Sequence, residues 1–187
     1  MITGRYAPHE AWPIIWNAIL AWVNGGTPLP NLRFGASVHS SYGPADALPE
    51  DHEKNAVLRG VNWYKNARML VHESWLSRLA KAEEWKDRVA PAPDRNCPVG
   101  DGSWGVLEGQ SSRVRFDGSQ YTRWYARADC NCESAMAFAL HGSSTGDRAS
   151  GRTAANLLDF VYTHSEIQQG PRADPASPSF GLLGWDT

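Results

Sequence analysis

Nine tryptophans constrain the fold of this 187-residue chain more than any other feature of its sequence. Each indole has a large flat apolar surface and one N–H donor, so it either packs in a core or stacks on a ligand such as a sugar ring. A folded chain of this length buries about 70% of the surface that it exposes when unfolded. The tryptophans therefore predict a globular chain whose core holds large side chains.

Helical periodicity dominates the first half of the chain. Apolar residues recur at spacings of three and four over residues 8–23, which predicts a helix that ends at Asn24-Gly25-Gly26. Residues 31–48 are rich in glycine, proline and small polar side chains and predict a loop, with one short extended piece at 33–38. A second helical region is predicted over residues 49–89, with a kink near Gly60 because its length exceeds that of a typical helix.

The second half begins with a proline-rich connector over residues 90–100. Short strands are then predicted at 104–109, 113–116 and 121–126, with Asp117-Gly118 as a hairpin turn. Helices follow at 131–140, ended by Gly142, and at 153–165, before a tail over 170–187. We expect a single domain over residues 1–187 that is mainly α, with helical hairpins and a small β-hairpin insertion.

The tryptophans fall into two groups by their position. Six of the nine lie on predicted helices, where we expect them to pack in the core. The other three, Trp104, Trp124 and Trp185, lie outside the helices and are candidates for stacking on a ligand.

Charge and motifs exclude several classes of function. The formal net charge is −2 and no block of Lys or Arg occurs, which argues against a nucleic-acid partner. No apolar run reaches the roughly 18 residues of a membrane span. The N-terminus lacks the pattern of a secretory signal, so we expect a cytoplasmic protein, or a secreted one if the N-terminus is truncated. Without a phosphate-binding glycine loop or a paired-histidine zinc motif, we expect no cofactor.

Three cysteines, Cys97, Cys130 and Cys132, leave at least one thiol unpaired within the chain. A disulfide between Cys130 and Cys132 would be strained because one residue separates them. We expect reduced, structural cysteines, in line with a cytosolic location. A metal site that uses Cys130 and Cys132 is the weaker alternative, since no further ligand follows at the usual spacing.

Carboxylates and arginines alternate between residues 101 and 133. Glycoside hydrolysis commonly uses two carboxyl groups, one as an acid and one as a base or nucleophile. Asp129 and Glu133 lie one turn apart at the start of a predicted helix, so both can face one cavity from the helix N-terminus. The set consists of Asp101, Glu108, Asp117, Asp129, Glu133, Arg113, Arg115, Arg123 and Arg127.

Structural roles compete with the catalytic one at each of these carboxylates. Asp117 is most simply a turn residue. Asp129 is either a helix cap or a site residue. A structural role and a functional role remain equally open for Asp129 and for Glu133. Glu108 precedes a glycine, which is typical of backbone close to a ligand but equally of an edge strand at the surface.

Three stretches resemble the loops of the six-hairpin glycosidases, the (α/α)6 toroids that act on polysaccharides. They are DGSWGVLEG at 101–109, DGSQ at 117–120 and RADCNCESAM at 127–136. A complete toroid has about twelve helices and, with ordinary helix and loop lengths, about twice as many residues as this chain. The resemblance therefore implies a partial toroid, or a fragment of a larger one.

The resemblance also implies roles for particular residues. Asp129 and Glu133 would share the acid and base roles with Glu108 nearby, and the partner would be an oligo- or polysaccharide. Substrate-binding residues would be Asp101, Trp104, Trp124 and Arg127, with Arg127 orienting a hydroxyl or a uronic carboxylate. The alternative is a non-catalytic carbohydrate-binding or oligomer-assembly module, because the apolar run at 180–185 favours association into a homo-oligomer.

Overall fold

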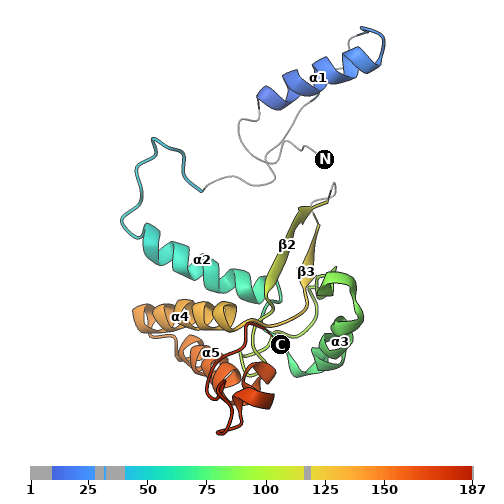
Figure 1. The fold of residues 1–187 in the computed structure, drawn as a ribbon. Helices are drawn as coiled ribbons and strands as arrows, with labels where there is room; N and C mark the ends of the chain where they lie inside the picture. Colours follow the sequence, from blue (N-terminus) through green and yellow to red (C-terminus); the bar gives the residue numbers. More distant parts are fainter. Residues whose placement is uncertain (1–9, 28–31, 33–40, 116–118, 187) are drawn as a thin grey trace. The chain divides into compact units, whose positions relative to one another are not determined.

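A computed structural model describes residues 10–27, 32, 41–115 and 119–186 of the chain. Its contacts divide the chain into two units, residues 1–49 and 50–187. Most of the regular structure is helical, and one small antiparallel sheet accompanies the helices (Figure 1). Within the described residues, no helix is both long and apolar enough to cross a membrane.

The first unit contains helix α1 (Ala11–Val23), none of whose residues is buried. The helix ends where the sequence predicts, because Gly25 and Gly26 adopt positive φ angles of 66° and 85° that favour glycine. Trp22, predicted to lie in the core, is 82% exposed. The extended piece predicted at 33–38 lies outside the described residues.

The second unit begins with α2 (His52–Asn66), and the prediction of one long helix over 49–89 is wrong. The chain leaves the helix at Arg68, whose φ is 57°, and Gly60 lies inside α2. The Arg68 side chain stabilises this exit by donating to the carbonyl oxygens of Lys65 (2.7 Å) and Cys97 (2.8 Å). An extended segment with buried Met69, Leu70 and Val71 follows and leads to α3 (Leu76–Lys81).

The sheet has three strands in the order β1-β3-β2, namely β1 (Val89–Pro91), β2 (Gly109–Val114) and β3 (Gln120–Arg123). The β2–β3 hairpin was predicted, although its turn at Asp117-Gly118 lies outside the described residues. Two details of the prediction are wrong. Residues 104–109 form no strand before Gly109, since Val106 makes only an isolated bridge with Leu70, and β1 lies where the predicted helix meets the connector.

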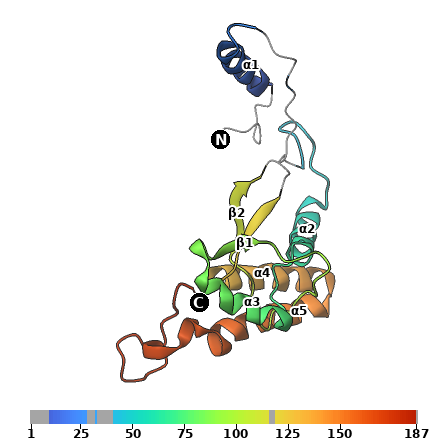
Figure 2. The same ribbon diagram turned by 90° about the vertical axis from the view of Figure 1, so that its right-hand side faces the viewer.

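Helices α4 (Ala128–Thr145) and α5 (Arg148–Asp159) pack side by side, with α2 along α4 (Figure 2). Gly142 does not end α4 as predicted. A Cβ atom there would lie 3.0 Å from the backbone nitrogen of Gly151, so the glycine permits close packing of the two helices. The helix ends instead at Gly146, with φ 76°, and Asp147 caps α5 by accepting from the amides of Ala149 and Ser150.

Several single turns complete the second unit. They are 3-10 turns at Glu73–Trp75, Ala82–Glu84, Lys86–Arg88, Glu166–Gln168 and Gly170–Arg172, and a π-helical turn at Phe160–His164.

Trp124 lies at the centre of the main core with 1% of its surface exposed. The ring centroids of Trp75 and Trp85 lie 6.5 Å and 6.0 Å from it in edge-on arrangements, and the Arg78 guanidinium lies 4.1 Å from its ring centre. Its indole nitrogen donates to the carbonyl of Pro91 in β1. The ring thereby joins α3, the 82–88 turns and the sheet.

Glycines hold residues 100–105 tightly against the core. Gly105 has a φ of 76°, and a Cβ atom there would lie 2.4 Å from the Phe160 ring. The backbone of this segment bonds to the extended piece after α2, since the amide of Val71 donates to the carbonyl of Gly105. The segment can approach so closely only because a side chain is absent.

Replacement of Gly105 by alanine should therefore destabilise the fold by about 2–4 kcal/mol, from left-handed strain and overpacking together. Urea unfolding followed by circular dichroism measures the change. Gly60→Ala is the matched control, since Gly60 is inside α2 with open space at its Cβ position. This control should stabilise the protein by about 0.5–1 kcal/mol. Equal stability of the two variants would contradict the packing described for residues 100–105.

Candidate functional site

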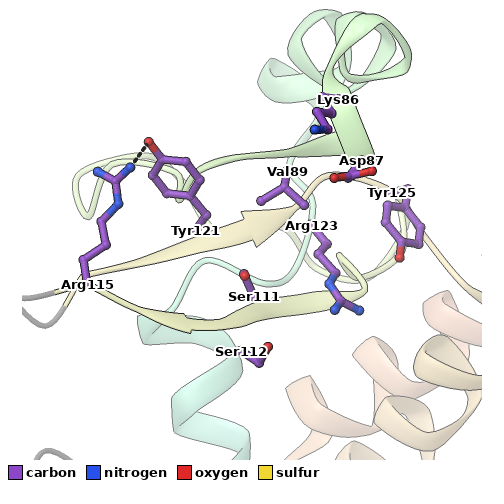
Figure 3. A pocket seen from close by; sticks show the side chains of 9 residues that line it. All are labelled: Lys86, Asp87, Val89, Ser111, Ser112, Arg115, Tyr121, Arg123 and Tyr125. Atoms are coloured by element: carbon purple, nitrogen blue, oxygen red, sulfur yellow. Dashed lines mark hydrogen bonds between the residues drawn. The ribbon is translucent and has the colours of Figure 1, made fainter. Parts of the chain in front are cut away.

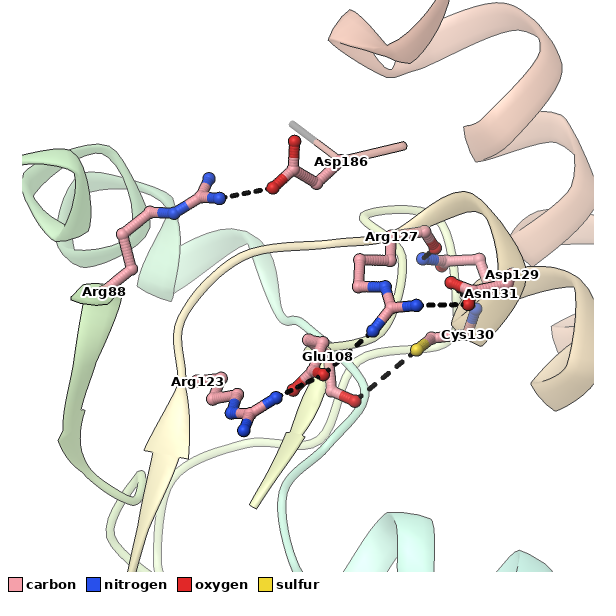
Figure 4. A network of polar contacts seen from close by, with 8 residues as sticks. All are labelled: Arg88, Glu108, Arg123, Arg127, Asp129, Cys130, Asn131 and Asp186. Atoms are coloured by element: carbon pink, nitrogen blue, oxygen red, sulfur yellow. Dashed lines mark hydrogen bonds and ion pairs between the residues drawn. The ribbon is translucent and has the colours of Figure 1, made fainter. Parts of the chain in front are cut away.

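Glu108 is the centre of a polar network just before the start of β2 and at the start of α4 (Figure 4). It follows Leu107, whose amide donates to the carbonyl of Met69 in the core. The Glu108 side chain is 8% exposed, and its Oε1 accepts from Arg123 Nη1 at 2.7 Å and from Arg127 Nη1 at 3.1 Å. Two guanidinium groups therefore hold one nearly buried carboxylate in place.

Arg127 connects this carboxylate to the helix that follows. It occupies the N-cap position of α4, and its Nη2 bonds to Asp129 Oδ2 while Nη1 bonds to Glu108. Its guanidinium lies 4.0 Å from the ring centre of Trp185. Its Nε is buried without a hydrogen-bond partner among the described residues. Arg127 thus holds two carboxylates next to each other through different nitrogens of one planar group.

Electrostatics bind Arg123 firmly to the network. The hydrogen bond that Arg123 donates to Glu108, followed by the charge of the same carboxylate, raises the pKa of Arg123 above its ordinary value. The side chain of Arg123 nevertheless stays 38% exposed.

Asp129 is not the helix cap that one of the two sequence-based hypotheses proposed. The cap position belongs to Arg127, and Asp129 accepts through Oδ1 from the amide of Cys130 at 2.8 Å. Its side chain is 40% exposed. Glu133, one turn further along α4, is exposed. The structure therefore brings Glu108 and Asp129 together on Arg127 and leaves Glu133 on the same side of the helix as Asp129.

The three cysteines are free thiols. Cys130 Sγ lies 3.6 Å from the backbone oxygen of Glu108, to which it donates. Burial, and then the charge of Asp129, raises the pKa of Cys130 to about 11. Cys130 is therefore a protonated, packed side chain at neutral pH. Within the described residues, no three His, Cys, Asp or Glu side chains group as a metal site would require.

Asp101 and Trp104 lie in a different place from the Glu108 network. They line a small pocket of about 360 Å³ together with His72, Glu73 and Ser103. Asp101 accepts from the amide of Ser103 at 3.0 Å, and this bond lowers the pKa of its carboxyl group. Trp104 is 41% exposed. Trp124, the remaining residue predicted to contact a substrate, is enclosed in the core and offers no open ring face to a ligand.

A larger cavity of about 780 Å³ adjoins the network through Arg123 (Figure 3). Its lining combines cationic, hydroxyl and aromatic side chains with one acid and one valine, namely Lys86, Asp87, Val89, Ser111, Ser112, Arg115, Tyr121, Arg123 and Tyr125. Sequence reasoning did not assign Lys86, Tyr121 or Tyr125 to a site. The spacing of two between Tyr121, Arg123 and Tyr125 was the available signal, since alternate residues of a strand share one face.

The C-terminal tail also reaches the network. Asp186 forms an ion pair with Arg88, and its backbone bridges that of Arg127. The guanidinium of Arg88 lies 4.0 Å from the ring centre of Tyr125, at the edge of the cavity. Trp185, singled out from the sequence as a tryptophan outside the helices, stacks on Arg127 and remains 66% exposed.

No protein-family model matches the chain, and no curated protein and no solved structure resembles it closely enough to count as a match.

Replacement of Glu108 by glutamine should lower the free energy of unfolding by about 2 kcal/mol. The amide leaves two arginines without their nearly buried partner, while their partial exposure reduces the penalty. Chemical denaturation measures the change. The control is Glu83→Gln, which removes an ion pair with Arg88 from a carboxylate that is 66% exposed. This control should change stability by no more than about 0.5 kcal/mol. A loss of no more than about 0.5 kcal/mol for Glu108→Gln as well would show that the network adds nothing to stability.

Proposed function

We propose that this chain is a carbohydrate-active, glycoside-hydrolase-like protein whose site lies at the N-terminal turn of α4. The observation that supports the proposal is the position of Asp129, which Arg127 holds beside Glu108 while 40% of the side chain stays exposed. Glycoside hydrolysis commonly needs two carboxyl groups near the scissile bond. Asp129 and Glu133 are the exposed pair that a glycan can reach.

In this proposal the side chains divide their roles by burial. Asp129 and Glu133 supply the acid and base groups, because both are accessible from solvent. Glu108 is a positioning residue, because both arginines already bind its Oε1. Arg127 orients Asp129, and Trp185, stacked on Arg127, offers an exposed indole to a sugar ring.

The architecture is compatible with the same proposal. The helical hairpin formed by α4 and α5, with α2 packed against α4, is the kind of unit from which an (α/α) toroid is built. We propose that these helices form part of such a toroid, with the N-terminal turn of α4 at its inner face. Asp101 and Trp104 would contact a different part of a glycan from their separate pocket.

The catalytic proposal predicts large kinetic effects from two neutral substitutions. Asp129→Asn and Glu133→Gln should each lower kcat about 10²- to 10⁴-fold on a glycan that the parent protein cleaves, the range expected for the loss of an acid–base group. Reducing-end release from a panel of polysaccharides measures turnover. Glu53→Gln, at the exposed first turn of α2, is the matched control and should leave kcat unchanged. Undiminished turnover in either site variant would remove that residue from the mechanism.

Exposed apolar side chains in the tail favour a second candidate function, a non-catalytic binding or assembly module. Phe180 is 55% exposed and Leu182 is 60% exposed. The next residue, Leu183, packs instead on a small core cluster. Apolar surface of this kind is common at interfaces between subunits.

Under this candidate the protein associates with itself, and Leu182→Ser should shift the molar mass measured by light scattering toward that of one chain. The control is Leu58→Ser on α2, which is 40% exposed and lies outside the tail. A parent protein that is a monomer at all concentrations would contradict self-association through the tail.

A further inference from the structure

We propose that the cavity beside the Glu108 network binds the acidic group of an anionic sugar, either a carboxylate or a sulfate. This inference rests on the proposed function and adds the substrate class to it. The cavity, of about 780 Å³, lies within the size range of small-molecule sites and is large enough for a short oligosaccharide.

Charge is the first argument. The lining contains three cations, Lys86, Arg115 and Arg123, and one acid, Asp87, which gives a formal charge of 3 − 1 = +2. Glu108, which is not part of the lining, forms an ion pair with Arg123, so the formal charge of the lining together with Glu108 is +1. Because the whole chain has a formal charge of −2, the cavity is positive on a protein that is otherwise slightly acidic.

Within the part of the chain that the structure describes, Lys86 and Arg115 have no carboxylate partner. Among the ion pairs of the described residues, none involves Lys86. Arg115 contacts the neutral Tyr121, donating to its hydroxyl at 2.5 Å and lying 4.1 Å from its ring centre. The charges of these two side chains are therefore uncompensated within the described site, and a ligand anion can bind to them without breaking an existing ion pair.

The rest of the lining suits a polyhydroxylated ligand. Ser111, Ser112, Tyr121 and Tyr125 bring hydroxyl groups that both donate and accept, and the two tyrosines add ring faces (Figure 3). A simple inorganic anion would use the cations and the hydroxyl donors but not the ring faces. The combination of all three kinds of group favours a sugar that carries an acid.

The backbone that presents Lys86 and Asp87 is held in an unusual conformation. Asp87 and Arg88 both have positive φ angles, 57° and 49°, although neither is glycine. The Arg88 side chain pairs with Asp186 and Glu83, and its carbonyl accepts from the amide of Trp124. Core and tail contacts thus fix this turn, and Lys86 is presented at the cavity edge on a strained but anchored segment.

Isothermal titration of the full chain with trigalacturonate and with its neutral counterpart galactotriose tests the inference. The acidic trisaccharide should bind at least about tenfold more tightly, and 0.5 M salt should remove most of that difference. A sulfated galactotriose distinguishes the two acids, since planar carboxylates and tetrahedral sulfates bind arginine differently. The Lys86→Ala/Arg115→Ala double variant should bind both acidic and neutral sugars equally.

Arg152→Ala, an exposed cation on α5 outside the cavity lining, is the control and should retain the preference. Urea unfolding of each variant confirms that the exposed substitutions leave the fold intact. Equal binding of acidic and neutral sugars by the parent, or binding of neither, overturns this inference. The proposed function is tested separately, by the turnover of the Asp129→Asn and Glu133→Gln variants on the polysaccharide panel. Tighter binding of a thymidine trinucleotide, lost in the double variant, would assign the cavity to nucleic acid and also overturn the inference.

Discussion

Burial of Trp124 is the constraint on which the arrangement of the second unit depends. Its ring contacts Trp75, Trp85 and Arg78 and bonds to β1, so it ties together elements far apart in sequence. Side chains alternate along an extended chain, and the inward direction of Thr122, Trp124 and Ala126 turns Tyr121, Arg123 and Tyr125 outward. The outward set forms the wall between the cavity and the Glu108 network. The core therefore determines which side chains the site can use.

Elements defined by local signals could be predicted from the sequence, and those defined by distant contacts could not. The end of α1 depends on two adjacent glycines, and the β2–β3 hairpin on alternation around a turn. The break after α2 depends instead on the Arg68 side chain reaching a carbonyl 29 residues away, which no window of sequence contains. Gly142 is a second example, because the need for a glycine there comes from close packing against Gly151 on the neighbouring helix.

The candidate site divides in the same way. Glu108, Arg127 and Asp129 were grouped from sequence and meet in space, because they flank one short hairpin and the helix start that follows it. Trp124 was misassigned, since an indole outside a helix has the same sequence signature whether it points into the core or toward a ligand. Asp101 and Trp104 were separated from the network by the close packing of the glycine-rich segment. Lys86 and Asp186 were missed because only the folded chain brings them near.

The ion pair between Arg88 and Asp186 joins residues 98 positions apart, and the same tail lays Trp185 over Arg127. During synthesis at about 5–20 residues per second, this stretch takes about 5 to 20 s to translate. Once β3 has been translated the sheet can form, while Arg88 and Arg127 still lack their tail partners. The wall of the site is thus among the last parts of the second unit to be completed, and a chain that ends between residues 167 and 185 contains the buried core residues but lacks the ion pair of Arg88 with Asp186.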